Sequence, residues 1–243
     1  MKPKKSLGQN FFVNKNLGDY IINKVAENNT PMIVEIGPGQ GFFTEKLLKI
    51  YQKVTVVEKD SDLANELKIK YPSITVLNED FLDLDLRIFK DTQITYFGSL
   101  PYNVSKPIIR KIVESDSFNT SAYFIIQKEV AEKYKYCKPY NILSLSTAIY
   151  ASVEKIFDIS PSSFNPKPNV NSSFVSMIPQ KDTFNDIEKL KKLILLSFKQ
   201  PRKTLRNNLR NTEFSTLIHE YGNNRPSDLS LTDYKKILDS NLV

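Results

Sequence analysis

The sequence predicts an α/β fold, in which helices cover a mixed sheet, followed by a small all-α C-terminal domain. Three observations predict it. A strand-favouring run at residues 33–36 enters a glycine-rich turn at 37–41, and a helical pattern follows directly. Short apolar segments then alternate with helical ones as far as residue 135, which favours a parallel sheet with right-handed crossovers. Beyond residue 180, apolar residues recur only at helical spacing, so we expect domains at 1–180 and 181–243.

The elements of the first domain follow from local patterns. A helix is expected to begin after Asn14, a residue type that caps helix N-termini, and to bury a face with Leu17, Ile21 and Val25. Further strands are expected near residues 53–58, 74–78, 93–98 and 121–127, and further helices near 61–70, 105–114 and 128–135.

The alternation then ends. Residues 143–153, 155–159 and 172–178 are strand-like with no long helix between them, which indicates antiparallel strands at one edge of the sheet. In the second domain, Pro201 is expected to begin a helix, because proline fits a first turn. Apolar pairs at 217–218 and 237–238 indicate two more helices.

Composition excludes several kinds of site. The chain has 243 residues, a net charge of +7 and a sequence pI near 9.2, which favours a polyanionic partner. Cys137 is the only cysteine and His219, expected on a helix surface, the only histidine. These counts exclude an intrachain disulfide, a His-based triad and a Cys or His zinc site, and we expect no metal. The sequence shows no membrane span and no signal peptide, so a cytoplasmic protein is expected.

Four motifs close predicted strands in chain order, and further motifs lie before and after them. The four are Glu-Ile-Gly-Pro-Gly (35–39), Glu58, Glu-Asp (79–80) and Leu-Pro-Tyr-Asn (100–103). With Gly-Gln-Asn-Phe-Phe (8–12), this set resembles the S-adenosylmethionine-dependent ribosomal RNA adenine dimethyltransferases. Matches at 127–131, 164–170 and 202–209 point to the KsgA/RsmA branch, which modifies small-subunit (16S) RNA. The resemblance covers nearly the whole chain and implies a Rossmann-like class I methyltransferase domain with a seven-stranded mixed sheet.

The resemblance implies S-adenosylmethionine as cofactor, and the residues fit it. Glycines in the turn let the backbone approach a ligand closely, and the turn carries no lysine, as a cofactor without phosphate allows. Glu58 can accept hydrogen bonds from two ribose hydroxyls, and Asp80 can accept one from the exocyclic amine of the adenine. In the family, residues after the basic N-terminal arm close over the cofactor. The expected cofactor-binding residues are Asn10, Phe12, Gly37, Gly39, Glu58, Asp80 and Ser99.

The expected reaction centre is Ser99–Tyr102. N6 of adenine is a poor nucleophile, because its lone pair is delocalised into the ring. Two acceptors would hold that lone pair toward the methyl group: the side chain of Ser99, and the backbone carbonyl of Leu100 or Pro101. Tyr102 would stack on the extruded base. Phe164 is expected to form a second aromatic wall, with a buried core phenylalanine as the competing interpretation.

Ser99 departs from the family, which usually has asparagine at this position. Serine also offers an acceptor oxygen, but its side chain is shorter and free to rotate. Related adenine and amine methyltransferases use serine here, so an active enzyme is expected. The substitution leaves the rate and the efficiency of the second methylation open.

A basic segment of the second domain is the expected RNA-binding surface. Its residues are Lys199, Arg202, Lys203, Arg206 and Arg210, most of them at helical spacing, and no acid lies between 199 and 210. A solvated basic face is the alternative. The family commonly has a further arginine where Pro201 stands, so this surface is weaker than usual.

The resemblance implies dimethylation at N6 of two adjacent adenosines in the 3′-terminal hairpin of small-subunit ribosomal RNA. The implied acceptor is a partly assembled small subunit, and a monomer is expected. One alternative is a large-subunit enzyme of the macrolide-resistance type, which shares the pattern at 167–173 but not the motifs at 127–131 and 202–209. Another is a catalytically weak RNA-binding assembly factor, an alternative that serine in place of the usual asparagine at position 99 leaves open. A DNA adenine methyltransferase is disfavoured, because no added target-recognition segment is present.

Overall fold

The structure is a computed structural model that describes residues 9–180, 184, 186–218 and 220–239. It divides into two compact units, Met1–Glu132 with Glu154–Pro179, and Lys133–Val153 with Gln180–Val243. His219 lies outside the described residues, so the structure does not address its expected position on a helix surface.

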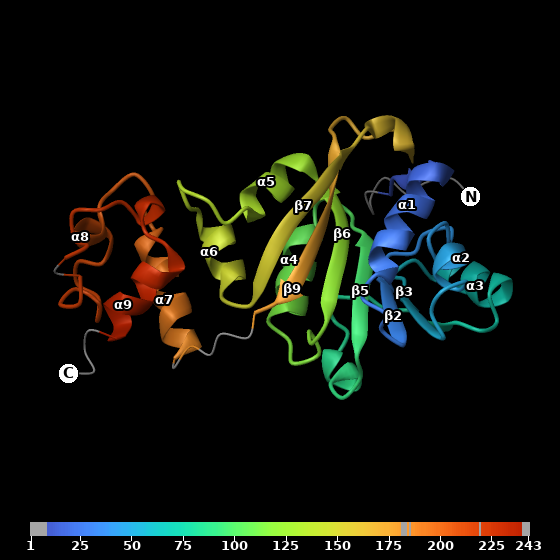
Figure 1. The fold of residues 1–243 in the computed structure, drawn as a ribbon, viewed down its shortest axis with the longest axis horizontal. Coiled ribbons are helices and arrows are strands. Elements are labelled where there is room, and N and C mark those ends of the chain that lie inside the picture. Colours follow the sequence, from blue (N-terminus) through green and yellow to red (C-terminus); the bar gives the residue numbers. More distant parts are fainter. Residues whose placement is uncertain (1–8, 181–183, 185, 219, 240–243) are drawn as a thin grey trace. The chain divides into compact units, whose positions relative to one another are not determined.

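The first unit is built on a seven-stranded mixed sheet of order β4-β3-β2-β5-β6-β9-β7 (Figure 1). Five strands are parallel and β9 runs antiparallel to β6. The strands are β2 (Met32–Ile36), β3 (Lys53–Val57), β4 (Thr75–Leu77), β5 (Ile94–Ser99), β6 (Ser121–Gln127), β7 (Ala151–Ile159) and β9 (Ser172–Pro179). The expected α/β class and seven-stranded mixed sheet are confirmed. The strand order reverses between β2 and β5, and ligands of such sheets bind outside the carboxyl ends at that point.

Helices flank the sheet on both faces. They are α1 (Lys15–Ala26), α2 (Thr44–Leu47), α3 (Ser61–Lys70), α4 (Ser105–Val113) and α5 (Lys128–Tyr134). The Asn14 side chain accepts a hydrogen bond from the amide of Leu17 at 3.1 Å and so caps α1 as expected. The helix after the glycine turn is a single short turn, α2.

Aromatic side chains dominate the core beneath the glycine turn. The ring of Phe43 lies 4.9 Å from those of Phe12 and Phe97, and Phe12 lies 5.2 Å from Phe164. All four are buried. Burying each such side chain contributes about 1.5–3 kcal/mol, so this group ties the N-terminal segment to the sheet and to the loop at residue 164.

The second unit is helical: α6 (Ile142–Ala148), α7 (Ile187–Ser197), α8 (Leu205–Asn208) and α9 (Leu231–Asp239). The strand expected over 143–153 is wrong for residues 143–150. Asn141 forms a capping box with Ser144, which starts α6, and the strand begins only at Ala151. Leu145 is buried with residues of α7 and α9, so 133–153, expected in the first domain, belongs to the helical unit. The chain enters the helical unit for the second time at Gln180.

Pro201 does not begin a helix. The Lys203 amide donates to the Gln200 carbonyl at 2.9 Å, which places Pro201 at the second position of a turn, a site proline favours. The buried Asn208 side chain exchanges hydrogen bonds with both backbone groups of Gln200 and so holds this turn. The helix expected at Leu217 is also wrong: residues 213–217 form turns.

No helix in the described ranges is long and apolar enough to cross a bilayer.

Candidate active site

The glycine turn opens the site. Gly37 and Gly39 have φ of 65° and 56°, a region that glycine adopts without steric cost. The Gly37 amide donates to the Val57 carbonyl at 3.0 Å, which ties the turn to the end of β3. A Cβ on Gly37 would meet no protein atom within 4 Å, whereas one on Gly39 would lie 2.9 Å from the ring of Phe11. Open space at Gly37 therefore allows a ligand to approach the backbone.

Glu58 faces this turn from the end of β3. One carboxylate oxygen accepts from the Asp60 amide at 2.9 Å, and the other accepts from the Gly39 amide at 3.2 Å. The side chain is buried, and burial raises the pKa of Glu58 above its ordinary value. Each oxygen keeps a lone pair, so the carboxylate can still accept from a diol.

A second buried acid, Glu35, lies in the motif before the turn. The Thr44 hydroxyl donates to its carboxyl group at 2.6 Å. Burial raises the pKa of Glu35 to about 8. This hydrogen bond links the end of β2 to α2 across the glycine turn.

Asp80 is paired with Lys59, a residue that no sequence motif indicated. Its carboxylate forms an ion pair with Lys59 at 2.7 Å and accepts from the Leu82 amide at 2.9 Å. The hydrogen bond from Lys59 is the main cause that holds the pKa of Asp80 below its usual range. Asp80 is therefore an oriented, ionised acceptor, and Lys59 is a positioning residue in the same cavity lining.

The reaction centre expected at Ser99–Tyr102 lies at the carboxyl end of β5. Within the described residues the Ser99 hydroxyl has no hydrogen-bond partner, and it lines the cavity. The Pro101 carbonyl accepts from the Val104 amide at 3.1 Å, whereas no described group donates to the Leu100 carbonyl. Of the two carbonyls expected as alternatives, that of Leu100 is therefore the one without a partner in the part of the chain that the structure describes.

Gly98 is a site residue that the sequence analysis missed. A Cβ at this position would lie 2.8 Å from the Ile36 carbonyl oxygen, so only glycine lets β5 approach the start of the glycine turn this closely. The signal was present, because a glycine in a strand interior indicates close backbone approach.

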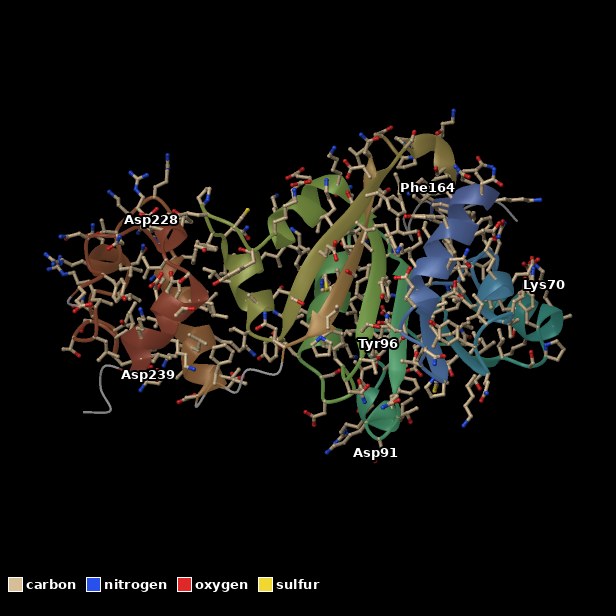
Figure 2. All side chains as sticks on the ribbon, viewed as in Figure 1. Lys70, Asp91, Tyr96, Phe164, Asp228 and Asp239 are labelled. Carbon is tan, nitrogen blue, oxygen red and sulfur yellow. The ribbon has the colours of Figure 1, made fainter. Side chains whose placement is uncertain are left out.

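Two aromatic residues border the reaction centre. The Tyr102 hydroxyl bonds Ser172 at 2.7 Å, and burial raises the pKa of Tyr102. Phe164 is 3% exposed, so it is a core residue, and it also lines the cavity. Figure 2 shows Phe164 at one end of the sheet and Asp91, which precedes β5, at the other. The aromatic residues thus lie where β5 ends.

A short two-stranded sheet, formed in part by the N-terminal segment of the chain, borders the cavity. Strand β1 (Phe11–Phe12) pairs antiparallel with β8 (Phe164–Asn165). The ring of Phe11 contacts Gly39, while Phe12 packs into the aromatic core. Phe11, which belongs to the motif at 8–12 but is not among the expected cofactor-binding residues, is therefore the aromatic residue at the glycine turn.

All residues expected at the cofactor and reaction sites line one cavity of about 550 Å³. They are Asn10, Phe12, Gly37, Gly39, Glu58, Asp80, Ser99, Leu100, Pro101, Tyr102 and Phe164. Among the described residues no group of three or more His, Cys, Asp or Glu side chains could hold a metal ion. The cavity therefore joins a backbone cradle and two acids to a pair of acceptors flanked by aromatic rings.

The five basic residues expected to bind RNA are all exposed, and in the described chain none of these five forms an ion pair. Their expected placement on one helix is wrong. Lys199, Arg202 and Lys203 lie in and beside the turn, Arg206 lies in the four-residue α8, and Arg210 follows it.

Known proteins show what this chain resembles. A family model described as "Ribosomal RNA adenine dimethylase" matches residues 1–240. Ribosomal RNA small subunit methyltransferase A of Fusobacterium nucleatum is 39% identical over 221 residues, covering 86% of this chain and 83% of that protein. A dimethyladenosine transferase from Plasmodium falciparum has a TM-score of 0.83 at 25% identity, covering 96% of this chain and 98% of that one. The 23S rRNA methyltransferase ErmE has a TM-score of 0.73 at 21% identity over 95% of this chain and all of that one (100%), a likeness of fold alone.

Proposed function

The chain belongs to the ribosomal RNA adenine dimethylase family, and from this premise we propose that it dimethylates N6 of two adjacent adenosines in the 3′-terminal hairpin of small-subunit ribosomal RNA. It uses S-adenosylmethionine and acts as a cytoplasmic monomer on a partly assembled small ribosomal subunit. One observation carries the proposal. Ser99 and Leu100 line the same cavity as the glycine turn and Glu58, and among the described residues the Ser99 hydroxyl and the Leu100 carbonyl have no hydrogen-bond partner.

The residues present fit S-adenosylmethionine. The open backbone at Gly37 suits the methionine part, and the two oxygens of Glu58 suit the ribose hydroxyls. Asp80, ionised beside Lys59, suits the adenine amine. When bound, the cofactor supplies a methyl group on a positively charged sulfur, which leaves as a neutral thioether.

The chain's own residues make N6 reactive. The Ser99 oxygen and the Leu100 carbonyl accept one hydrogen bond each from the two N–H groups of N6. These bonds turn the nitrogen lone pair out of conjugation and toward the methyl group. As the N–C bond forms, N6 becomes positively charged, and both hydrogen bonds strengthen because the donor is now charged. The proton of N6 then leaves to solvent, a step that needs no histidine.

Tyr102 and Phe164 hold the extruded base between them. Stacking on an aromatic face contributes about 1–3 kcal/mol per base, which offsets part of the cost of extrusion. The bond from Tyr102 to Ser172 fixes the ring position before the base arrives. Pre-organised walls place N6 where the acceptors lie.

The test is transfer of labelled methyl groups to small ribosomal subunits that lack dimethyladenosine, with large subunits as the control. Dimethyladenosine only in the small-subunit RNA is the expected result. Label in the large subunit would indicate the resistance-type activity. Cofactor binding without transfer to either subunit would indicate an RNA-binding assembly factor.

A further inference from the structure

Helix α4 begins directly after the reaction centre and has one apolar and one basic face. Ile108, Ile109 and Ile112 are buried against the sheet. Lys106 and Arg110 lie one turn apart on the exposed face. The stretch 102–113 contains no acidic residue.

These two cations have no structural task in the described part of the chain. Neither Lys106 nor Arg110 forms an ion pair or a side-chain hydrogen bond there. The next cation, Lys111, differs: its ammonium donates to the Leu82 carbonyl and lies 5.9 Å from the ring centre of Phe81. Lys111 therefore joins α4 to the loop after Asp80, while Lys106 and Arg110 face solvent.

Lys106 also lies at a position where the helix disfavours a positive charge. It lies in the first turn, where the macrodipole disfavours a cation by about 0.3–1 kcal/mol, and that turn has no acid to compensate. Lys106 therefore does not stabilise the start of α4.

Lys106 lies close in sequence to residues that line the cavity. Tyr102, Asn103, Val104 and Ile108 line the cavity, and Lys106 lies between them in sequence. A base that enters this cavity must leave its helix, and its backbone stays outside the pocket. The phosphates next to the target nucleotide are therefore the anions nearest to this face.

We propose that Lys106 and Arg110 bind the RNA phosphates that flank the target adenosine. The inference rests on the proposed function and deepens it by assigning an RNA contact to the catalytic unit itself. Phosphate contacts position a nucleic acid without reading its sequence, so this face would hold the strand while Tyr102 and Phe164 hold the base.

The salt dependence of binding tests this directly. Each phosphate contact contributes about 0.7 to the slope of log K against log salt for a single strand and about 0.9 for a duplex. The double variant Lys106→Ala/Arg110→Ala should therefore lower the slope by about 1.4–1.8 on the small-subunit 3′-terminal hairpin. If the contacts vanish at 1 M salt, binding at 0.1 M should weaken by about 25-fold or more.

Two controls separate this effect from general loss of charge. Lys106→Arg/Arg110→Lys keeps both charges and should keep the slope. Lys53→Ala removes one exposed lysine at the amino end of β3, whereas the cavity lies at the carboxyl ends of the strands. This variant should leave the slope unchanged. The dissociation constant of S-adenosylmethionine should stay within about threefold in every variant.

The outcomes are distinct. An unchanged slope in the alanine double variant overturns the inference. Weaker binding of this variant to whole small subunits, with normal binding to the free hairpin, overturns it too, because that second result would indicate an acidic protein partner. Methyl transfer by the unmodified chain is measured in parallel. Its absence would refute the proposed function, whereas the slope tests the phosphate contacts independently.

Discussion

Ser99→Ala tests the proposed mechanism most directly. Within the described residues the hydroxyl has no partner, so its removal strands no buried donor or acceptor. The free energy of unfolding should therefore change by less than about 0.5 kcal/mol. Only the bond from N6 in the transition state is lost.

The expected loss follows from the charge on that bond. A hydrogen bond to a charged group contributes about 1.5–3 kcal/mol, and each 1.36 kcal/mol is a factor of ten in rate. The rate of methyl transfer should fall about 10- to 150-fold. The dissociation constant of S-adenosylmethionine should change by less than about threefold, because Glu58 and the glycine turn stay intact.

The assay is single-turnover transfer to methyl-free small subunits, with cofactor affinity measured by calorimetry. Ser73→Ala, which removes an exposed hydroxyl in the turn after α3, is the matched control and should transfer at the normal rate. A Ser99→Ala rate within threefold of the unmodified chain would remove Ser99 from the mechanism. Ser99→Asn, which introduces the residue usual in the family, should retain activity.

Three further predictions concern Glu58, Tyr102 and the buried Glu35. Glu58→Gln should raise the dissociation constant of S-adenosylmethionine at least tenfold, because one carboxylate acceptor becomes a donor facing the amide of Gly39 or Asp60; calorimetry with an unchanged constant would contradict the ribose assignment. Tyr102→Phe should keep most activity, because it loses only the hydrogen bond to Ser172. Tyr102→Ala should lower kcat/KM for RNA by about 5- to 150-fold, because it loses the stacking on the base. Equal effects of the two variants in steady-state kinetics would exclude stacking. Glu35 has a pKa raised by burial from 4.5 to about 8, so the folded state holds a proton that the unfolded chain releases, and stability must fall as pH rises between these values. Glu35→Gln cannot ionise and should show a smaller decline of Tm between pH 5 and 8; parallel declines by circular dichroism would show that Glu35 does not titrate in this window.

In the parallel part of the sheet, expectations based on local chemistry were confirmed. Asn14 caps α1, and the parallel strands and their helices lie within a few residues of the expected bounds. Glycine spacing, strand patterns and caps depend on neighbours in the chain, so they are legible without the fold. Where the second unit was misjudged, a distant contact decided the outcome: α6 packs with α7 and α9, and Asn208 holds the turn at Pro201.

The sequence by itself determined which side chains could serve the chemistry, because motifs at the ends of parallel strands meet at one edge of a sheet. The tertiary structure alone decided how each is held. It engages the Pro101 carbonyl, leaves that of Leu100 without a donor among the described residues, pairs Asp80 with Lys59, and sets Phe11 against Gly39. Each of these depends on where a backbone group or side chain from another segment lies, and one-dimensional spacing does not contain that information.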